Sequence, residues 1–95
     1  MTMELKTGCF VFSKAGRDKG SACLVVGFDK KNALIADGKA HGIGNPKKKN
    51  PLHLQPVNAF VSEELQQKLK AGTLRDEEIR RALRDWEEKS NGNAD

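Results

Sequence analysis

The sequence predicts a mainly β fold with C-terminal helices. Its first half contains short apolar runs separated by turn residues, which is the pattern of strands joined by hairpins. After residue 58 the pattern changes to apolar residues at helical spacing among many charges. Short antiparallel strands in a chain of 95 residues are typical of a small barrel that closes on itself and so hides its edges. We expect such a barrel, with two helices over one opening or edge of it.

Four segments are predicted to be strands. The runs at 9–12 (CFVF) and 22–28 (ACLVVGF) are rich in Val, Phe and Cys and are flanked by turn residues. A third run, 32–38, follows the polar turn at 29–32. The fourth, 51–57, alternates leucine with polar residues and contains two prolines, which is typical of an edge strand.

Two helices are predicted in the rest of the chain. Ser62 is a candidate N-cap for the first, and Gly72 is its expected end. Thr73 is the predicted N-cap of the second, with Asp76 three residues later in an approximate capping box. The second helix carries one apolar stripe, formed by Ile79, Leu83 and Trp86. We expect this stripe to pack inside the protein; the alternative is a helix that docks on another protein.

The basic charge belongs to the first part of the chain. The formal net charge is +4. Residues 1–58 contain ten Lys and Arg against four Asp and Glu, a net +6, whereas residues 59–95 have a net charge of −2. A basic balance indicates a polyanionic partner. We therefore divide the chain into a basic barrel over 1–58 and a helical C-terminal extension over 59–95.

The segment 13–22, SKAGRDKGSA, carries more charge than a hairpin turn requires. Gly16 and Gly20 can adopt the backbone conformations of a tight turn, and Asp18 is expected to accept hydrogen bonds from backbone donors within it. The cations at the rim of this loop are Lys14, Arg17 and Lys19. Together with backbone N–H groups beside the glycines, they can meet phosphate oxygens. The alternative is a solvated turn whose charges only maintain solubility.

A second basic segment, 38–50 (GKAHGIGNPKKKN), is predicted to be a long exposed loop. Consecutive lysines on a flexible loop can reach successive phosphates, and each contact adds salt dependence. The alternative is a charged loop with no ligand. The candidate phosphate contacts here and in the next strand are Lys39, His41, Lys47, Lys48, Lys49 and His53. Lys30 and Lys31 lie on another hairpin, and we expect them to be solvated charges only.

Metal binding and catalysis are not expected. The spacing of Cys9, Cys23, His41 and His53 matches neither a paired-cysteine knuckle nor a Cys₂His₂ finger. Both cysteines lie in apolar runs, where Cys behaves as a small hydrophobe. No orienting third group or oxyanion loop accompanies a Cys–His pair. GRDKGS leads into a strand, whereas a phosphate-binding P-loop must open a helix. We expect no cofactor.

The same composition predicts a cytoplasmic protein. The first residues, MTMELKTG, place Glu and Lys where a signal peptide needs an apolar core. The longest apolar run is far too short to cross a membrane. Two cysteines are too few for a secreted disulfide scaffold, so we expect reduced thiols and no membrane partner.

Residues 11–27, VFSKAGRDKGSACLVVG, resemble a KOW motif, in which a Gly-basic-Asp-Lys-Gly loop joins two apolar strands. The motif occurs in ribosomal proteins and transcription-elongation factors. Over about 4–57, including LIADG and PKKKN-LHL in order, the chain is similar to small bacterial KOW-domain RNA-binding proteins. Those proteins in turn resemble large-subunit ribosomal proteins of archaeal and eukaryotic type.

The resemblance implies an SH3-like β-barrel that binds RNA, usually ribosomal RNA, without catalysis. By position, the signature residues of the KOW loop are Gly16, Lys19 and Gly20, and their basic companions are Lys14 and Arg17. It also implies association with the ribosome or translation, with ribosomal proteins as further candidate partners. The alternative is an SH3-like module that docks on a protein of a translation or transcription complex.

The aromatic content bears on this choice. Peptide-binding barrels cluster aromatic side chains, but residues 1–58 contain only Phe10, Phe12 and Phe28, all expected in the core. Platforms that stack bases also need exposed aromatics. We therefore expect recognition of the phosphates and shape of structured RNA, with little sequence reading.

Overall fold

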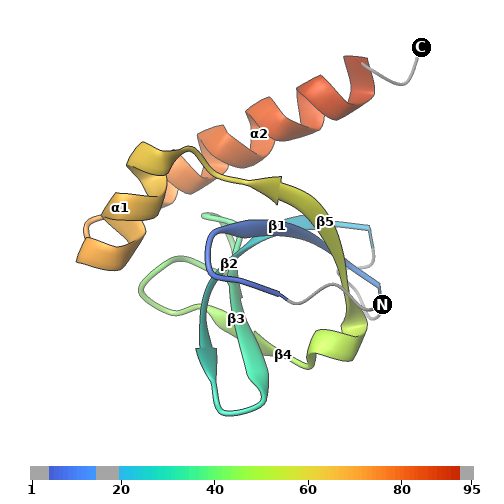
Figure 1. The fold of residues 1–95 in the computed structure, drawn as a ribbon, viewed down its shortest axis with the longest axis vertical. Coiled ribbons are helices and arrows are strands. Elements are labelled where there is room, and N and C mark those ends of the chain that lie inside the picture. The colour runs from blue at the N-terminus through green and yellow to red at the C-terminus, as the bar shows by residue number, and fades with distance from the viewer. Residues whose placement is uncertain (1–4, 15–19, 93–95) are drawn as a thin grey trace.

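The computed structural model describes residues 5–14 and 20–92 (Figure 1). In this part the chain forms an antiparallel sheet followed by two helices, so the prediction of strands and then two helices is confirmed, although the strand at 47–49 and the 3₁₀ helix at 51–53 were not predicted. The elements are β1 (Cys9–Ser13), β2 (Ala22–Asp29), β3 (Asn32–Ala36), β4 (Lys47–Lys49), the 3₁₀ helix η1 (Pro51–His53), β5 (Leu54–Phe60), α1 (Glu63–Ala71) and α2 (Asp76–Gly92).

The sheet is curved but not closed. Its strand order is β4-β3-β2-β1-β5, and every pairing is antiparallel. The register shifts between Val25 and Gly27 and between Cys9 and Val11, and irregularities of this kind bend a strand and increase its twist. β4 and β5 are the two edges, and no pairing joins them within the described residues.

Two of the predicted strands have different bounds. The third ends at Ala36, and the fourth is replaced by η1 and then β5, which runs past residue 58 to Phe60. Pro51 explains the difference, because a residue without an N–H and with φ near −65° suits the first turn of a helix. The side chain of Asn50 caps that turn by accepting a hydrogen bond from the Leu52 N–H at 3.0 Å. β5 is an edge strand, as predicted.

Each face of the sheet has its own apolar core. One consists of strand residues: Cys9, Val11, Cys23, Val25, Ala33, Ile35 and Leu54. The other joins strands to helices: Phe10, Leu24, Ala36, Val61, Leu74, Ile79 and Leu83. Successive side chains of a strand point to opposite faces, and a strand that is buried on both faces reads as a continuous apolar run. This is why CFVF and ACLVVGF show no alternation.

The helices therefore cover a face of the sheet, and not an opening or edge as predicted (Figure 1). The stripe of α2 packs inside the protein, as expected. Trp86 stacks on Phe10, with ring centroids 4.6 Å apart and an angle of 6° between the ring planes. Its ring centroid is also 5.0 Å from that of Phe12. Phe28 does not belong to the core, because it is 46% exposed near the end of β2.

The ends of the helices test the capping predictions. Ser62 caps α1 by accepting a hydrogen bond from the Leu65 N–H, and Gly72 ends it at φ 77°. The predicted N-cap Thr73 is wrong. Its N–H donates to the Lys68 carbonyl at 2.9 Å, so this residue belongs to the C-terminal turn of α1. α2 begins at Asp76 instead.

Candidate nucleic-acid interface

The predicted phosphate-binding loop lies between β1 and β2, as the hairpin assignment requires. Gly16, Arg17 and Lys19 lie outside the described residues. The base of the loop is closed by two backbone hydrogen bonds, from Ser13 to the Ser21 carbonyl at 3.0 Å and from Gly20 to the Ser13 carbonyl at 2.7 Å. Gly20 has φ 88°, a conformation that costs any other residue strain.

A residue from a distant segment of the chain joins this base. The N–H of Lys14 donates to the carbonyl of His53 at 2.7 Å, and both residues are exposed. His53 is held there because it ends η1, where its own N–H donates to the Asn50 carbonyl at 2.8 Å. The structure thus brings together two candidates that are far apart in the sequence.

Lys39 and His41 lie in a turn that is much more ordered than the predicted loop. The Asp37 carboxylate accepts hydrogen bonds from the N–H groups of Lys39 at 2.9 Å and His41 at 3.1 Å. The turn is attached to α2 through Asp76, whose carboxylate accepts from the Ile43 N–H at 2.7 Å. The sequence prediction missed this because the acceptor that anchors the turn lies on a distant helix.

The lysine triplet is a strand, and this corrects the prediction of a flexible loop. Lys47, Lys48 and Lys49 form β4 and pair with Ile35, Leu34 and Ala33 of β3. Because side chains alternate along a strand, Lys48 lies on the opposite face from the other two and the triplet does not present one row of cations.

The middle lysine of the triplet is engaged near the β2–β3 turn. The ammonium of Lys48 is 2.7 Å from the carboxylate of Asp29 at the end of β2, and this hydrogen bond raises the pKa of Lys48. Asp29 precedes Lys30 and Lys31 in the β2–β3 turn. The basic candidates therefore lie in at least three places: Lys14 and His53 at the loop base, Lys39 and His41 in the turn after β3, and Lys48 beside the β2–β3 turn.

A groove adjoins the loop base, with a volume of about 760 Å³. It is lined by Gly20 and Ser21 on one side, by Asp37 and Lys39 on another, and by α2. The cations that line it are Lys39, Arg80, Arg81 and Arg84, and the carboxylates are Asp37, Glu77 and Glu87. We call this the arginine groove. The sequence did not reveal it because the charges of the extension nearly cancel.

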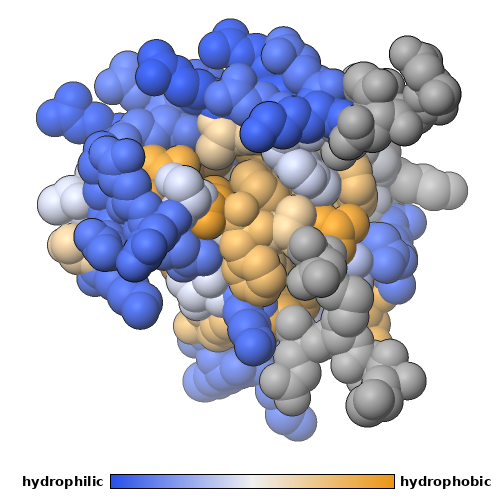
Figure 2. All heavy atoms as spheres, turned by 45° about the horizontal axis from the view of Figure 1, so that its top comes forward, coloured by the Kyte–Doolittle hydropathy of each residue, from blue (hydrophilic) through white to orange (hydrophobic). Residues whose placement is uncertain are grey.

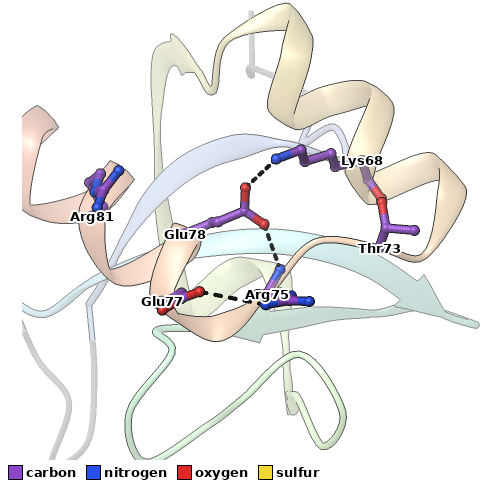
Figure 3. A pocket seen from close by; sticks show the side chains of 6 residues that line it. All are labelled: Lys68, Thr73, Arg75, Glu77, Glu78 and Arg81. Carbon is purple, nitrogen blue, oxygen red and sulfur yellow. Dashed lines mark hydrogen bonds and ion pairs between the residues drawn. The ribbon is translucent and has the colours of Figure 1, made fainter.

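A second hollow lies where α1 meets α2 (Figure 3). Lys68 points at Glu78, and their charged atoms are 2.6 Å apart. Glu78 also accepts a hydrogen bond from the Arg75 N–H at 3.0 Å, which satisfies a donor at the start of α2. The bonds from Lys68 and Arg75 hold the pKa of Glu78 below its ordinary value. The ion pair between Lys68 and Glu78 therefore links α1 to α2 at this hollow.

The cysteines lie in the core, as predicted. Cys9 and Cys23 are buried and form no disulfide in the described chain, and burial raises the pKa of the Cys9 thiol. Among residues 5–14 and 20–92, no group of three His, Cys, Asp or Glu side chains is placed to hold a metal ion. None of the described helices is both long enough and apolar enough to cross a membrane.

Comparison with known proteins adds no assignment. No protein-family model matches the chain, and no curated protein matches it. The KOW resemblance therefore depends on the residues that carry it.

Proposed function

We propose that this protein is a non-catalytic RNA-binding protein of the cytoplasm that binds structured ribosomal RNA and acts at the ribosome or in translation. The support from the sequence is the KOW-like segment 11–27 and the net charge of +6 over residues 1–58. The support from the structure is the place of that loop, between β1 and β2 at one end of the sheet.

The proposal includes an SH3-like barrel over 1–58, with 59–95 as a helical extension. The strand order β4-β3-β2-β1-β5, the bends in β1 and β2 and the 3₁₀ turn from one edge strand to the other all favour it. A sheet that curls until its edge strands approach each other leaves little edge for unwanted pairing. The extension packs on the outer face through the second core.

The observation that carries the proposed function is the hydrogen bond from Lys14 to His53. It holds an exposed lysine and an exposed histidine together beside the attachment of the GRDKG loop. A lysine and a histidine from separate segments can both donate hydrogen bonds to a phosphate backbone, whose negative charges succeed one another along a strand. Lys47, Lys48 and Lys49 are proposed to meet a different stretch of the RNA, beside the β2–β3 turn.

The test compares two variants with the same reduction in charge. The loop variant replaces Lys14, Arg17 and Lys19 by alanine. The control variant replaces three cations of the helical extension by alanine: Lys70, Arg75 and Lys89, all exposed. Binding of labelled ribosomal RNA fragments is measured against salt concentration.

We expect the loop variant to bind more weakly, with the negative slope of log K against log salt shallower by about 2–3, which is roughly 0.7–0.9 for each of three phosphates that are no longer neutralised. The control variant should keep the slope of the unmodified protein. Equal slopes for the two variants would refute the role of the loop. Crosslinking in cells, followed by sequencing of the bound RNA, identifies the target; recovery of no RNA above the background of a sample that was not crosslinked would refute RNA binding altogether.

One observation favours the alternative, a protein-interaction module. Apolar side chains gather in the middle of the face shown in Figure 2, with hydrophilic side chains around much of the area. Phe60, at the end of the edge strand β5, is 46% exposed, and Leu52 in η1 is 78% exposed. Exposed apolar areas of this kind are a feature of protein-docking surfaces. Replacing Phe60 by serine would then abolish recovery of a protein partner and leave the salt slope for RNA unchanged.

A further inference from the structure

The arginine groove has an ordered arrangement of charge along α2. Arg80 and Arg84 are one turn apart, at a rise of about 6 Å, and Arg81 is next to the first of them. Glu77 and Glu87 lie about one turn beyond them on either side. The cations therefore occupy the middle of this wall and the carboxylates its ends. Lys39 contributes a further cation from the turn after β3.

The guanidinium groups differ in how far they are engaged. Arg80 donates to the carbonyl of Gly38, which fixes the end of its side chain and leaves further donors of the guanidinium available. Arg81 and Arg84 are exposed, and neither forms an ion pair with another residue in the described part of the chain. By contrast, the carboxylate of Asp37 already accepts two backbone hydrogen bonds. Among the described charged side chains of the groove, unengaged cations therefore outnumber unengaged carboxylates.

These groups match the chemistry of a sugar–phosphate backbone. A guanidinium presents its donors as a planar fork that binds two phosphate oxygens at once. Two such forks one helical turn apart can contact neighbouring phosphates of one strand. The groove begins at Gly20 and Ser21, which form the base of the KOW-like loop, so a strand that contacts the loop can continue along α2.

The side of the groove next to the sheet is aromatic. Phe12 lines it, is half-buried, and lies against Trp86 with ring centroids 5.0 Å apart. Trp86 is the single tryptophan of the chain. A ligand that enters the groove contacts Phe12, which in turn contacts Trp86, so binding should change the fluorescence of Trp86.

We propose that the arginine groove is a second phosphate-binding site, which takes the backbone of the same RNA that contacts the loop. This inference rests on the proposed function. It assigns part of the RNA-binding surface to the helical extension. The net charge of −2 over residues 59–95 does not by itself indicate such a role. The contacting side chains are Arg81 and Arg84, with Arg80 positioned by Gly38.

The test uses the full chain and a labelled RNA hairpin with a single-stranded flank. The groove variant carries Arg81→Gln and Arg84→Gln, and its matched control carries Lys70→Gln and Lys89→Gln, both exposed and outside the groove. Glutamine keeps the helix propensity of α2 nearly unchanged. Circular dichroism and thermal unfolding show whether each variant is folded as the unmodified protein is.

We expect the negative slope of log K against log salt to become shallower by about 1.4 in the groove variant, roughly 0.7 for each of two phosphates, and to stay unchanged in the control. We also expect RNA to change the fluorescence of Trp86 in the unmodified protein and less so in the groove variant. If the unmodified protein binds, the loop variant binds more weakly and the groove variant matches its control, the groove inference alone is refuted. If the unmodified protein binds no RNA, the proposed function and the inference both fail.

Discussion

The most informative test of the fold is the replacement Ile79→Ala in α2. Ile79 is fully buried, and its cluster includes Phe10, Leu24 and Ala36 from three neighbouring strands. The helical extension is bound to the sheet through such contacts, so this one side chain reports whether the two parts form a single folding unit.

The size of the effect follows from the atoms removed. Replacing isoleucine by alanine deletes three carbon atoms, and their transfer from water is worth about 2.4 kcal/mol at about 0.8 each. The cavity left behind adds to this, so we expect a decrease of about 3–4 kcal/mol in the free energy of unfolding. A chain of 95 residues is stable by about 5–14 kcal/mol in total. The variant should thus fold but melt roughly 15 °C lower or more.

The assay is urea unfolding followed by two signals. Far-UV circular dichroism reports secondary structure, and the fluorescence of Trp86 reports the docking of α2, because this ring stacks on Phe10. Leu52→Ala serves as the control, since Leu52 is 78% exposed and its replacement should cost less than about 0.5 kcal/mol. If Ile79→Ala lowers the free energy of unfolding by less than about 1 kcal/mol, or if the unmodified protein unfolds in two separate transitions, the sheet and the helices do not form a single folding unit.

Two further outcomes are expected. The hydrogen bond from Lys68 holds the pKa of Glu78 below its ordinary value of 4.5, so this pair stabilises the fold above that pH and stops doing so as the pH falls through the lowered pKa. The urea midpoints of the unmodified protein and Glu78→Gln should therefore converge as the pH falls from above 4.5 through the lowered pKa of Glu78; a constant difference contradicts this. Gly38→Ala should destabilise the fold by at least about 1–3 kcal/mol, because Gly38 has φ 77° and a Cβ there would lie 2.5 Å from the Asp76 carbonyl oxygen. Gly44→Ala, with no atom within 4 Å of the added carbon, should unfold within about 0.5 kcal/mol of the unmodified protein, and equal destabilisation by both would contradict the steric argument.

Local signals in the sequence predicted much of the fold. The hairpin at GRDKG, the apolar strands around it and the capping of α1 by Ser62 depend on residues within a few positions of one another. The second cap was missed for a specific reason: Thr73 has the right side chain, but the turn that ends α1 engages its N–H. The sequence does not show whether Thr73 closes the end of α1 or caps the start of α2.

The candidate site was harder to predict. KKK looks the same in sequence whether it is a flexible loop or an edge strand, and only pairing with β3 divides its side chains between two faces. Arg80 and Arg84 have the spacing of one helix face, and this signal was present in the sequence. The sequence does not show that this helix face lines a groove, because the opposite wall, around Gly20 and Lys39, comes from distant segments.

From the sequence alone one could therefore predict strands followed by two helices, the basic segment in the first hairpin and the burial of the cysteines. These follow from short-range periodicity and composition, which act along the chain. Which charged and polar groups lie together was settled by the tertiary structure: Lys14 with His53, Lys48 with Asp29, and the arginines of α2 with the base of the loop. The reason is that strand pairing and the docking of α2 on the sheet set distances across the fold, and charge interacts through space and not along the chain.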